Sequence, residues 1–281
     1  DALALGHHGQ KLAVQIIQAA TQFIEGHICC CHSLVMVWLK VTVPQFYGCG
    51  AGAASAPRTA YHGRMSEPSS ELLGTPLPEQ PLMLASEWLA EAWRRRLQPN
   101  PNTMTLATAT VDGWPAARIV LCKDVVGVPG YVVFYTNFQS RKGLELGKNP
   151  RAAAVMHWDH MHRQVRIEGL VETAPAADSD AYFASRARES RIGAWASAQS
   201  RPVASREALL AQVEETTRRF ATGEVPRPSF WGGYRLWAEA VELWVEGPAR
   251  IHDRARWTRA LQRAADGGIR PGPWSATRLQ P

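Results

Sequence analysis

The stretch Met104-Thr-Leu-Ala-Thr-Ala-Thr-Val-Asp-Gly-Trp-Pro-Ala-Ala-Arg-Ile-Val-Leu-Cys-Lys123 contains two short runs with the composition of β-strands. The first run is Met104–Thr110, the second is Ala116–Lys123, and Val111-Asp-Gly-Trp114 joins them. Asp-Gly between two such runs is a strong signal for a hairpin turn. The stretch therefore predicts a pair of antiparallel strands.

Further short strands follow this hairpin at regular spacing. The predicted runs are Tyr131–Thr136, Ala152–His157, Gln164–Val171, Tyr234–Trp237, Ala240–Val245 and Arg250–Arg254. Helices are expected at residues 82–97, in a turn at 140–146, and at Asp178–Ser185, Ser190–Ala198 and Ser205–Phe220, and residues 266–273 are expected to form a loop. Short strands in this order favour an α+β fold built on a small antiparallel barrel or sandwich over a parallel doubly wound sheet. The sequence has no GxGxxG or Walker-type loop.

Composition limits the classes of partner. The chain has 281 residues, 46% of them hydrophobic, which is enough for a sizeable core. Its net charge of +6 favours anionic partners, and phosphorylated small molecules fit this as well as nucleic acid does. The five cysteines, with no CxxC pair, argue against a disulfide framework and against a zinc site, so no metal is expected. A reducing, cytoplasmic location is the simplest interpretation.

The first 64 residues differ from the rest of the chain. They carry four of the five cysteines and an apolar patch, residues 28–43, that is too short to span a membrane. Ala54-Ser-Ala56 resembles a signal-peptidase site, but the apolar patch lies too far from the first residue for a signal peptide. We therefore expect residues 1–64 to lie outside the functional domain, residues 65–81 to form a mobile arm, and residues 82–281 to form the functional domain.

Three basic or aromatic side chains are expected to share one face of the strand Arg250–Arg254. The two-residue period of a strand places Arg250, His252 and Arg254 on the same side. Such a cluster favours a phosphate or another anionic ligand, because cations that lie together repel each other unless an anion faces them. The alternative is a solvated, basic edge strand.

A phosphate site is also predicted around the 140–146 turn. Ser140 is the expected N-cap, and Arg141 and Lys142 follow it, so free backbone N–H groups and two cations converge there. Arg118 and Lys123 lie in the neighbouring predicted strand, but their odd separation places them on opposite faces if that strand is regular. A bulge, or contacts to different ligands, would be needed for both to serve one site.

A third group lies on the predicted helices. Tyr182, Arg186 and Ser190 are spaced by four residues, which stacks them on one face if a helix continues through Arg188. A phenol, a guanidinium and a hydroxyl suit a phosphate monoester, although an ordinary amphipathic helix gives the same spacing. Gln164 could bind the edge of a heterocycle. Because no acid–base pair or nucleophile motif is present, redox chemistry by a bound organic cofactor becomes plausible.

Seven blocks of sequence, taken in order, resemble the pyridoxamine/pyridoxine 5′-phosphate oxidase family. They are Arg118-Ile-Val-Leu-Cys-Lys123, Phe134-Tyr-Thr-Asn-Phe-Gln-Ser-Arg-Lys-Gly143, Arg163-Gln-Val-Arg-Ile-Glu-Gly169, Ser185-Arg-Ala-Arg-Glu-Ser-Arg-Ile-Gly-Ala-Trp195, Gln199-Ser200, Pro228-Ser-Phe-Trp-Gly-Gly-Tyr234 and Arg250-Ile-His-Asp-Arg254. The resemblance covers about residues 82–281 and implies an FMN-binding split β-barrel, antiparallel and Greek-key-like, with surrounding helices. It also implies a homodimer with FMN at the subunit interface.

The resemblance assigns roles to individual residues. Positions that match FMN-binding positions are Arg118, Lys123, Tyr135, Thr136, Arg141, Lys142, Gln164, Gln199, Ser200, Trp244 and Arg254. Positions that match the substrate site are Lys123, Tyr182, Arg186, Ser190, Arg250 and His252. Arg250 and His252 are the implied catalytic pair, which holds the pyridine ring and polarises the C4′ substituent.

The implied reaction is the oxidation of pyridoxine or pyridoxamine 5′-phosphate to pyridoxal 5′-phosphate. A hydride passes from C4′ to flavin N5, and O2 then reoxidises the flavin and gives H2O2. Three features depart from the family pattern: residues 65–81 lack an Arg-x-x-Tyr-like arm, Val245 stands where Gln is common, and Ala187 stands where Pro is common. The alternatives are a related flavin oxidase with another substrate, such as a phenazine precursor, and a flavin-binding protein without activity. Nucleic-acid and membrane partners are not expected.

Overall fold

The computed structural model describes residues 72–265 and 267–281. The expectations for residues 1–64, and for residues 65–71 of the arm, lie outside these ranges. The helices are α3 (Pro81–Arg95), α4 (Arg141–Lys148), α5 (Ala176–Ser185), α6 (Arg188–Ala196) and α7 (Arg206–Arg219), with short 3-10 turns at Asp159–Met161 and Pro248–Arg250. Within the described residues, no helix has both the length and the apolar composition needed to cross a membrane.

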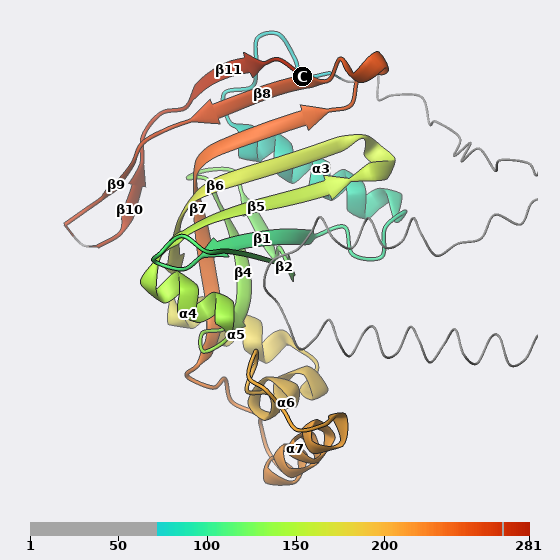
Figure 1. Ribbon diagram of the computed structural model, residues 1–281, viewed down its shortest axis with the longest axis vertical. Helices are drawn as coiled ribbons and strands as arrows, with labels where there is room; N and C mark the ends of the chain where they lie inside the picture. The colour runs from blue at the N-terminus through green and yellow to red at the C-terminus, as the bar shows by residue number, and fades with distance from the viewer. Residues whose placement is uncertain (1–71, 266) are drawn as a thin grey trace, which may run out of the picture. The chain divides into compact units, whose positions relative to one another are not determined.

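One curled antiparallel sheet of nine strands forms the centre of the fold (Figure 1). Its strands are β1 (Thr103–Ala109), β2 (Pro115–Leu121), β3 (Asp124–Val126), β4 (Tyr131–Asn137), β5 (Arg151–Trp158), β6 (Arg163–Thr173), β7 (Trp231–Val245), β8 (Asp253–Thr258) and β11 (Ser275–Leu279). The order is β11-β8-β7-β6-β5-β1-β2, and β4 pairs with both β3 and β7. A separate hairpin contains β9 (Leu261–Arg263) and β10 (Ile269–Pro271). The predicted α+β fold on an antiparallel barrel is confirmed.

Strand β7 pairs with three other strands, β4, β6 and β8. Its first half, Trp231–Trp237, pairs with β4, and its second half, from Ala240 onward, pairs with β8 along the same edge. Strand β6 pairs with almost the whole length of its other edge. The backbone N–H of Lys123, just after β2, donates to Val133 O of β4 at 2.7 Å, so the sheet curls back on itself.

A bulge in β7, where Glu239 has no partner in β6, lets the sheet bend. The register between β6 and β7 shifts between Glu168 and Gly169, so Glu168 faces Ala240 while Gly169 faces Ala238. A Cβ atom on Gly169 would lie 1.9 Å from the carbonyl oxygen of Trp237. Only glycine allows the two backbones to approach this closely, so the bend depends on this residue.

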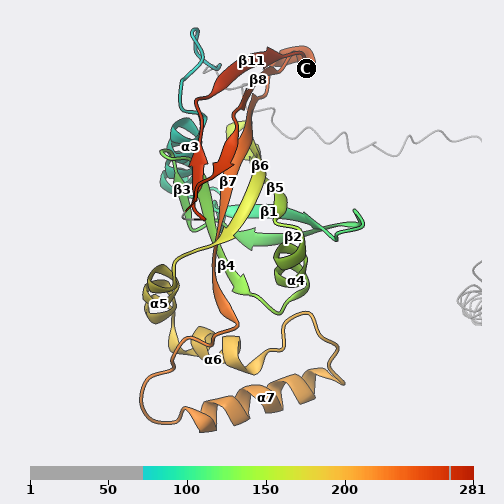
Figure 2. The same ribbon diagram turned by 90° about the vertical axis from the view of Figure 1, so that its left-hand side faces the viewer.

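Helices cover both sides of the sheet (Figure 2). Helix α3 lies on one side and α4 on the other, while α5, α6 and α7 extend beyond the β4 end. Leu82, Ala85, Trp88 and Ala92 of α3 recur at helical spacing and are buried in the core, which explains why residues 81–95 form an amphipathic helix. The segment before α3 is bound to the C-terminal strands, since Leu73 N donates to Asp253 Oδ2 at 2.7 Å.

Most predicted elements are confirmed with small changes of boundary, and three are wrong. The two predicted strands Tyr234–Trp237 and Ala240–Val245 form one continuous strand, because the pairing with β6 continues past the bulge. The predicted loop at 266–273 contains the strand β10. The predicted strand Arg250–Arg254 does not form as a unit, because Pro248–Arg250 is a 3-10 turn and β8 begins only at Asp253.

Candidate functional site

A cavity of about 520 Å³ lies against β2, β4 and helices α4, α5 and α6. It collects nine of the residues that the sequence predicted for cofactor or substrate. These residues are Arg118, Lys123, Tyr135, Thr136, Lys142, Tyr182, Arg186, Ser190 and Gln199. We call it the phosphate cavity because of the cations that line it.

The odd spacing of Arg118 and Lys123 causes no conflict. Strand β2 ends at Leu121, so the alternation of faces stops before Lys123. Lys123 lies in the link to β3, where its backbone N–H bonds to β4. Both side chains line the phosphate cavity without a bulge in β2.

The N-terminus of α4 places Lys142 at the cavity wall. Ser140 is the N-cap, as predicted, and its hydroxyl accepts from the Gly143 N–H. The buried Lys142 Nζ donates to Gln199 Oε1 at 2.9 Å, to Thr136 Oγ1 at 3.0 Å and to Ser140 Oγ at 3.3 Å. Burial, together with repulsion from Arg118, lowers the pKa of Lys142 to about 8. The ammonium group has neutral partners only, so a bound anion would stabilise its charge.

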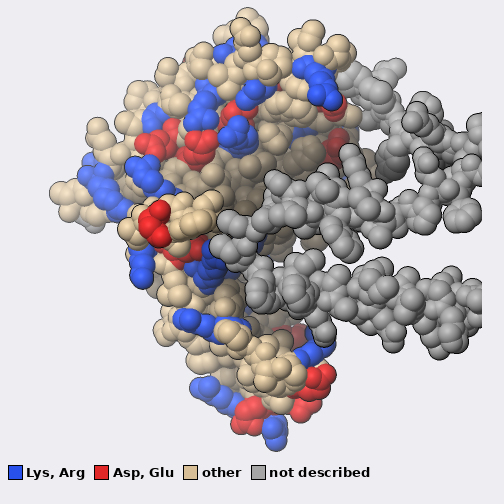
Figure 3. Space-filling model, in the orientation of Figure 1, with Lys and Arg blue, Asp and Glu red and all other residues tan. Residues whose placement is uncertain are grey.

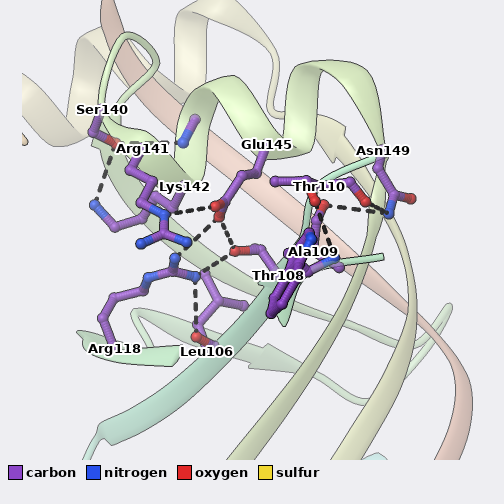
Figure 4. Close-up of polar contacts among 12 residues, drawn as sticks. Leu106, Thr108, Ala109, Thr110, Arg118, Ser140, Arg141, Lys142, Glu145 and Asn149 are labelled. Atoms are coloured by element: carbon purple, nitrogen blue, oxygen red, sulfur yellow. Dashed lines mark hydrogen bonds and ion pairs between the residues drawn. The ribbon is translucent and has the colours of Figure 1, made fainter. Parts of the chain in front are cut away.

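Glu145 lies between two of the predicted phosphate-binding guanidiniums (Figure 4). Its carboxylate accepts from Arg118 Nη2 at 3.1 Å and from Arg141 Nε at 2.8 Å. It also accepts from the hydroxyl of Thr108 at 2.5 Å. Burial raises the pKa of Glu145, but these three hydrogen bonds together outweigh it and hold the pKa below its usual range. The carboxylate is therefore charged at neutral pH.

The backbone that carries Tyr182, Arg186 and Ser190 to the cavity differs from the predicted continuous helix. Helix α5 ends at Ser185, Arg186 and Ala187 have extended backbones, and α6 begins at Arg188. A single helical face through these residues is therefore wrong. The break between the helices nevertheless leaves all three side chains at the cavity.

Arg186 is the residue of this group whose surroundings most favour an anionic ligand. Its guanidinium lies 4.8 Å from the ring centre of Trp231, and its buried Nη1 has no hydrogen-bond partner within the described residues. Burial lowers the pKa of Arg186 from its ordinary value. The rings of Tyr135 and Tyr182 stack beside it with centres 4.0 Å apart. A buried donor without a partner is costly, so this arrangement favours an anionic ligand at Arg186.

A second group of predicted residues lies at the far end of β7. Gln164, Trp244 and Arg254 face one another in register across β6, β7 and β8. Arg254 is held by the buried carboxylate of Glu242, which accepts from its Nε at 3.0 Å and its Nη2 at 2.8 Å. Basic and acidic side chains lie side by side on the upper face in Figure 3. The ion pairs that join β6, β7 and β8 are Arg166–Glu242, Arg254–Glu242 and Arg256–Glu168.

The loop before β8 carries Arg250 and His252. A Cβ atom on Gly247 would lie 1.8 Å from Ile251 O, so glycine permits the tight turn, in which Arg250 has a φ of 64°. The Gly247 N–H donates to His252 Nδ1 at 3.2 Å, which leaves the proton of a neutral ring on Nε2. The imidazole lies 4.7 Å from the ring of Trp244. His252 therefore joins the Trp244 group through this turn and not through a shared strand face.

The predicted site residues thus fall into two groups within one chain. None of Gln164, Trp244, Arg250, His252 and Arg254 lines the phosphate cavity. Figure 1 shows β8 and the end of β7 at the top of the molecule, with α4, α5 and α6 below. Arg141 and Ser200 line a second cavity of about 510 Å³, which Glu145 also lines. The two cavities adjoin at Glu145, because Arg118 of the phosphate cavity and Arg141 both donate to its carboxylate. Sequence reasoning missed Glu145 and Trp231, although the i,i+4 spacing of Arg141 and Glu145 was a usable signal.

Comparisons with known proteins agree with this arrangement. The curled antiparallel sheet and its helices are the fold of FMN-binding split-barrel proteins. A solved PhzG from Burkholderia lata 383, in complex with tetrahydrophenazine-1-carboxylic acid, matches with a TM-score of 0.62 and 30% identity over 73% of this chain and 94% of that chain. A pyridoxamine 5′-phosphate oxidase-related, FMN-binding protein from Nostoc punctiforme shares the fold, with a TM-score of 0.53 and 15% identity over 74% of this chain and 100% of that chain.

Matches of sequence identify the family more closely than these matches of fold do. Residues 89–219 match the family model of pyridoxamine 5′-phosphate oxidase, and residues 231–281 match a second model, the pyridoxine 5′-phosphate oxidase C-terminal dimerisation region. The chain is 48% identical to a pyridoxine/pyridoxamine 5′-phosphate oxidase of Caulobacter vibrioides over 72% of its length and 86% of the relative's. It is 46% identical to one from Cereibacter sphaeroides over 72% of its length and 96% of the relative's. The chain belongs to the pyridoxine/pyridoxamine 5′-phosphate oxidase family and is an oxidoreductase.

Proposed function

We propose that the chain oxidises pyridoxine 5′-phosphate and pyridoxamine 5′-phosphate to pyridoxal 5′-phosphate, with FMN as cofactor and O2 as electron acceptor. The observation that carries the proposal is the phosphate cavity, in which five cationic or hydroxyl side chains predicted for phosphate binding meet. They are Arg118, Lys123, Lys142, Arg186 and Ser190. Family membership supplies the reaction, and the cavity supplies the anion-binding groups that both the substrate and FMN require.

The residues present fit a flavin phosphate. Lys142 has only neutral partners, and the Nη1 and Nη2 atoms of Arg141 have no hydrogen-bond partner within the described residues. Arg118, Arg141 and Lys142 would hold the phosphate, and Tyr135, Thr136, Gln199 and Ser200 would contact the rest of the cofactor. When bound, FMN would accept two electrons from the substrate and pass them to O2, so that H2O2 forms for each pyridoxal 5′-phosphate.

A homodimer would bring the two groups of site residues together. In one chain, Trp244, Arg254 and His252 lie away from the phosphate cavity, within the segment 231–281 that matches the family's dimerisation region. We infer that the partner subunit presents this group, together with Gln164, to the cofactor in the cavity. Each of the two sites then lies at the subunit interface.

Two groups of residues would orient the substrate, one at its phosphate and the other at its pyridine ring. Tyr182, Arg186 and Ser190 would bind its phosphate, with Lys123 between substrate and cofactor. Arg250 and the Nε2–H of His252 would hold the pyridine ring and polarise the C4′ substituent. Holding C4′ against the cofactor and stabilising developing charge are the contributions that such groups make to the rate.

The full chain, reconstituted with FMN and given pyridoxine 5′-phosphate in air, tests the proposal. Pyridoxal 5′-phosphate and H2O2 are expected to appear in equal amounts, because one O2 takes up the two electrons of each turnover. Absorbance of the aldehyde product and a peroxide assay measure the two together. Flavin binding without either product would overturn the proposed substrate and would leave the fold and cofactor assignment standing.

A phenazine precursor is the second candidate, because the PhzG structure shares the fold and 30% of the matched residues. The oxidases of vitamin B6 phosphates are nearer, at 46–48% identity. The retention of Tyr182, Arg186 and Ser190 at one cavity also favours a phosphorylated substrate. Turnover of a reduced phenazine carboxylic acid, but not of pyridoxine 5′-phosphate, would make the phenazine precursor the favoured substrate.

FMN affinity is expected to fall as the pH rises through about 8, the pKa of Lys142 in the free protein. The phosphate is a dianion throughout this range and favours the charged ammonium, so FMN raises this pKa and binding takes up a proton above pH 8. Between pH 7 and pH 9.5 the Kd should rise about tenfold. Fluorescence titrations of the apoprotein measure this. In Lys142→Arg the charge does not titrate, so an equally steep pH dependence in that variant would contradict the assignment.

A further inference from the structure

The carboxylate of Glu145 connects the two guanidiniums that are proposed to hold the cofactor phosphate. Arg118 belongs to β2 and Arg141 to the first turn of α4, so no single element fixes their relative position. Glu145 Oε2 accepts from Arg118 Nη2 and from the Thr108 hydroxyl, while Oε1 accepts from Arg141 Nε. Figure 4 shows the carboxylate between them. Strand β1, strand β2 and helix α4 are therefore tied together at one side chain.

These contacts leave some N–H donors of each arginine without a partner: Nη1 and Nη2 of Arg141, and Nε of Arg118 within the described residues. Arg141 uses only Nε on Glu145, so its two terminal nitrogens are unpaired within the described residues. Arg118 is fixed on its other side, since Nη1 donates to Leu106 O at 3.2 Å and to Thr108 Oγ1 at 2.5 Å. Both oxygens of Glu145 accept from these partners, and an ionised carboxylate has no hydrogen to donate to a phosphate. It orients guanidiniums whose remaining N–H groups a phosphate can accept.

The charge balance supports the same role. Arg118, Arg141 and Lys142 carry three positive charges, and Glu145 is a buried carboxylate that stays ionised beside them. Without it, the two guanidiniums would repel each other, and the ammonium would lose the one charge that raises its pKa. With it, the cluster keeps a net charge of about +2, which matches a phosphate dianion.

We propose that Glu145 is a positioning residue for the cofactor phosphate, which acts through Arg118 and Arg141 and makes flavin binding depend on that phosphate. The proposal rests on the assignment of FMN to the phosphate cavity. It differs from a general structural role in one respect: the loss of Glu145 should weaken the binding of FMN and not that of riboflavin, which has the same ring system and no phosphate.

The test compares FMN and riboflavin on the full-length apoprotein by quenching of flavin fluorescence. In Glu145→Gln one oxygen remains and the new amide N–H2 faces a guanidinium, so at least one arginine loses its anchor. The Kd for FMN is expected to rise about tenfold or more, and that for riboflavin to change less than about twofold. The matched control is Glu215→Gln on α7, which removes a carboxylate from an exposed pair with Arg218. Both Kd values should stay unchanged there.

Two results would overturn the proposal. Removing a negative charge near the phosphate tends to tighten FMN binding, so an unchanged or lower Kd for FMN in Glu145→Gln would show that orientation is not its contribution. An equal loss for FMN and riboflavin would show a structural role only. If the unmodified protein itself binds FMN no more tightly than riboflavin, the cofactor assignment fails as well, and this separates the two failures.

A double-mutant cycle provides a second readout. If Glu145 acts through Arg141, Glu145→Gln should weaken FMN binding less in an Arg141→Gln background than alone, because one of its targets is already missing. The pH at which FMN affinity falls should also be lower in Glu145→Gln, since the carboxylate raises the pKa of Lys142. Full additivity, together with an unshifted pH profile, would contradict the proposal.

Discussion

Replacing both Arg250 and His252 with alanine is expected to lower kcat/KM for pyridoxine 5′-phosphate by about 1,000-fold, or about 4 kcal/mol. The turn that Gly247 permits presents both side chains, and the His252 ring is fixed by the Gly247 N–H and by Trp244. In the proposed mechanism these groups act on the substrate ring and C4′, so their loss removes contacts that strengthen in the transition state. Steady-state kinetics of the FMN-loaded variant measure the effect.

Flavin affinity in the same variant separates catalysis from cofactor binding. The Kd for FMN should stay within about twofold of the unmodified value, because neither side chain is assigned to the phosphate. Ile251→Ala is the matched control, since Ile251 lies in the same loop and its side chain is 71% exposed. A double variant with near-normal turnover would refute the catalytic roles, and one that releases FMN would assign the pair to the cofactor.

Trp158→Ala is expected to lower the free energy of unfolding by about 3–5 kcal/mol, the range for removing a large buried aromatic side chain. Trp158 ends β5 and is fully buried. Its indole Nε1 donates to Pro101 O at 2.7 Å, in the link between α3 and β1. The variant would therefore leave both a cavity and an unpaired carbonyl. Urea unfolding of the apoprotein at a fixed protomer concentration measures the change.

Two further variants test the reason for this loss. Trp158→Phe keeps most of the volume and removes only the hydrogen bond, so the expected loss is about 1–3 kcal/mol. Trp93→Ala removes the same kind of side chain from an exposed position of α3, where about half of its surface is accessible, and should cost much less. Equal losses for Trp93 and Trp158 would mean that burial in this core is not what makes Trp158 important.

The strands and helices could be predicted largely because local pattern governs them. The Asp-Gly turn, the alternation in β2 and the spacing of Trp88 and Ala92 each report on neighbouring residues. The backbone conformation of residues 248–254 could not be predicted from a local pattern. A strand was predicted from the alternation of Arg250, His252 and Arg254, but the contact of Gly247 with Ile251 imposes a turn that this pattern does not reveal.

Motifs predicted nine of the residues that line the phosphate cavity, but not the way in which the fold brings them together. Helical spacing placed Tyr182 and Ser190 on one face, whereas the break at Arg186 and Ala187 brings them to the cavity from two helices. Glu145 was not predicted as a site residue, because its role depends on an ion pair with Arg118, which lies in a strand far from it in the sequence. Contacts of this kind form only when the sheet is assembled, so a single sequence carries little trace of them.

The pairing of β7 also governs the timing of folding during synthesis. Phe134 of β4 pairs with Tyr234 of β7, a hundred residues further along the chain. At ordinary ribosomal rates of about 5–20 residues per second, β4 waits roughly 5–20 s for its partner. During that interval β4, whose Tyr135 and Thr136 line the phosphate cavity, has no β7 beside it. Because Trp231 of β7 also lines the cavity, the cavity can form only after β7 has been made, and cofactor loading must follow the synthesis of that strand.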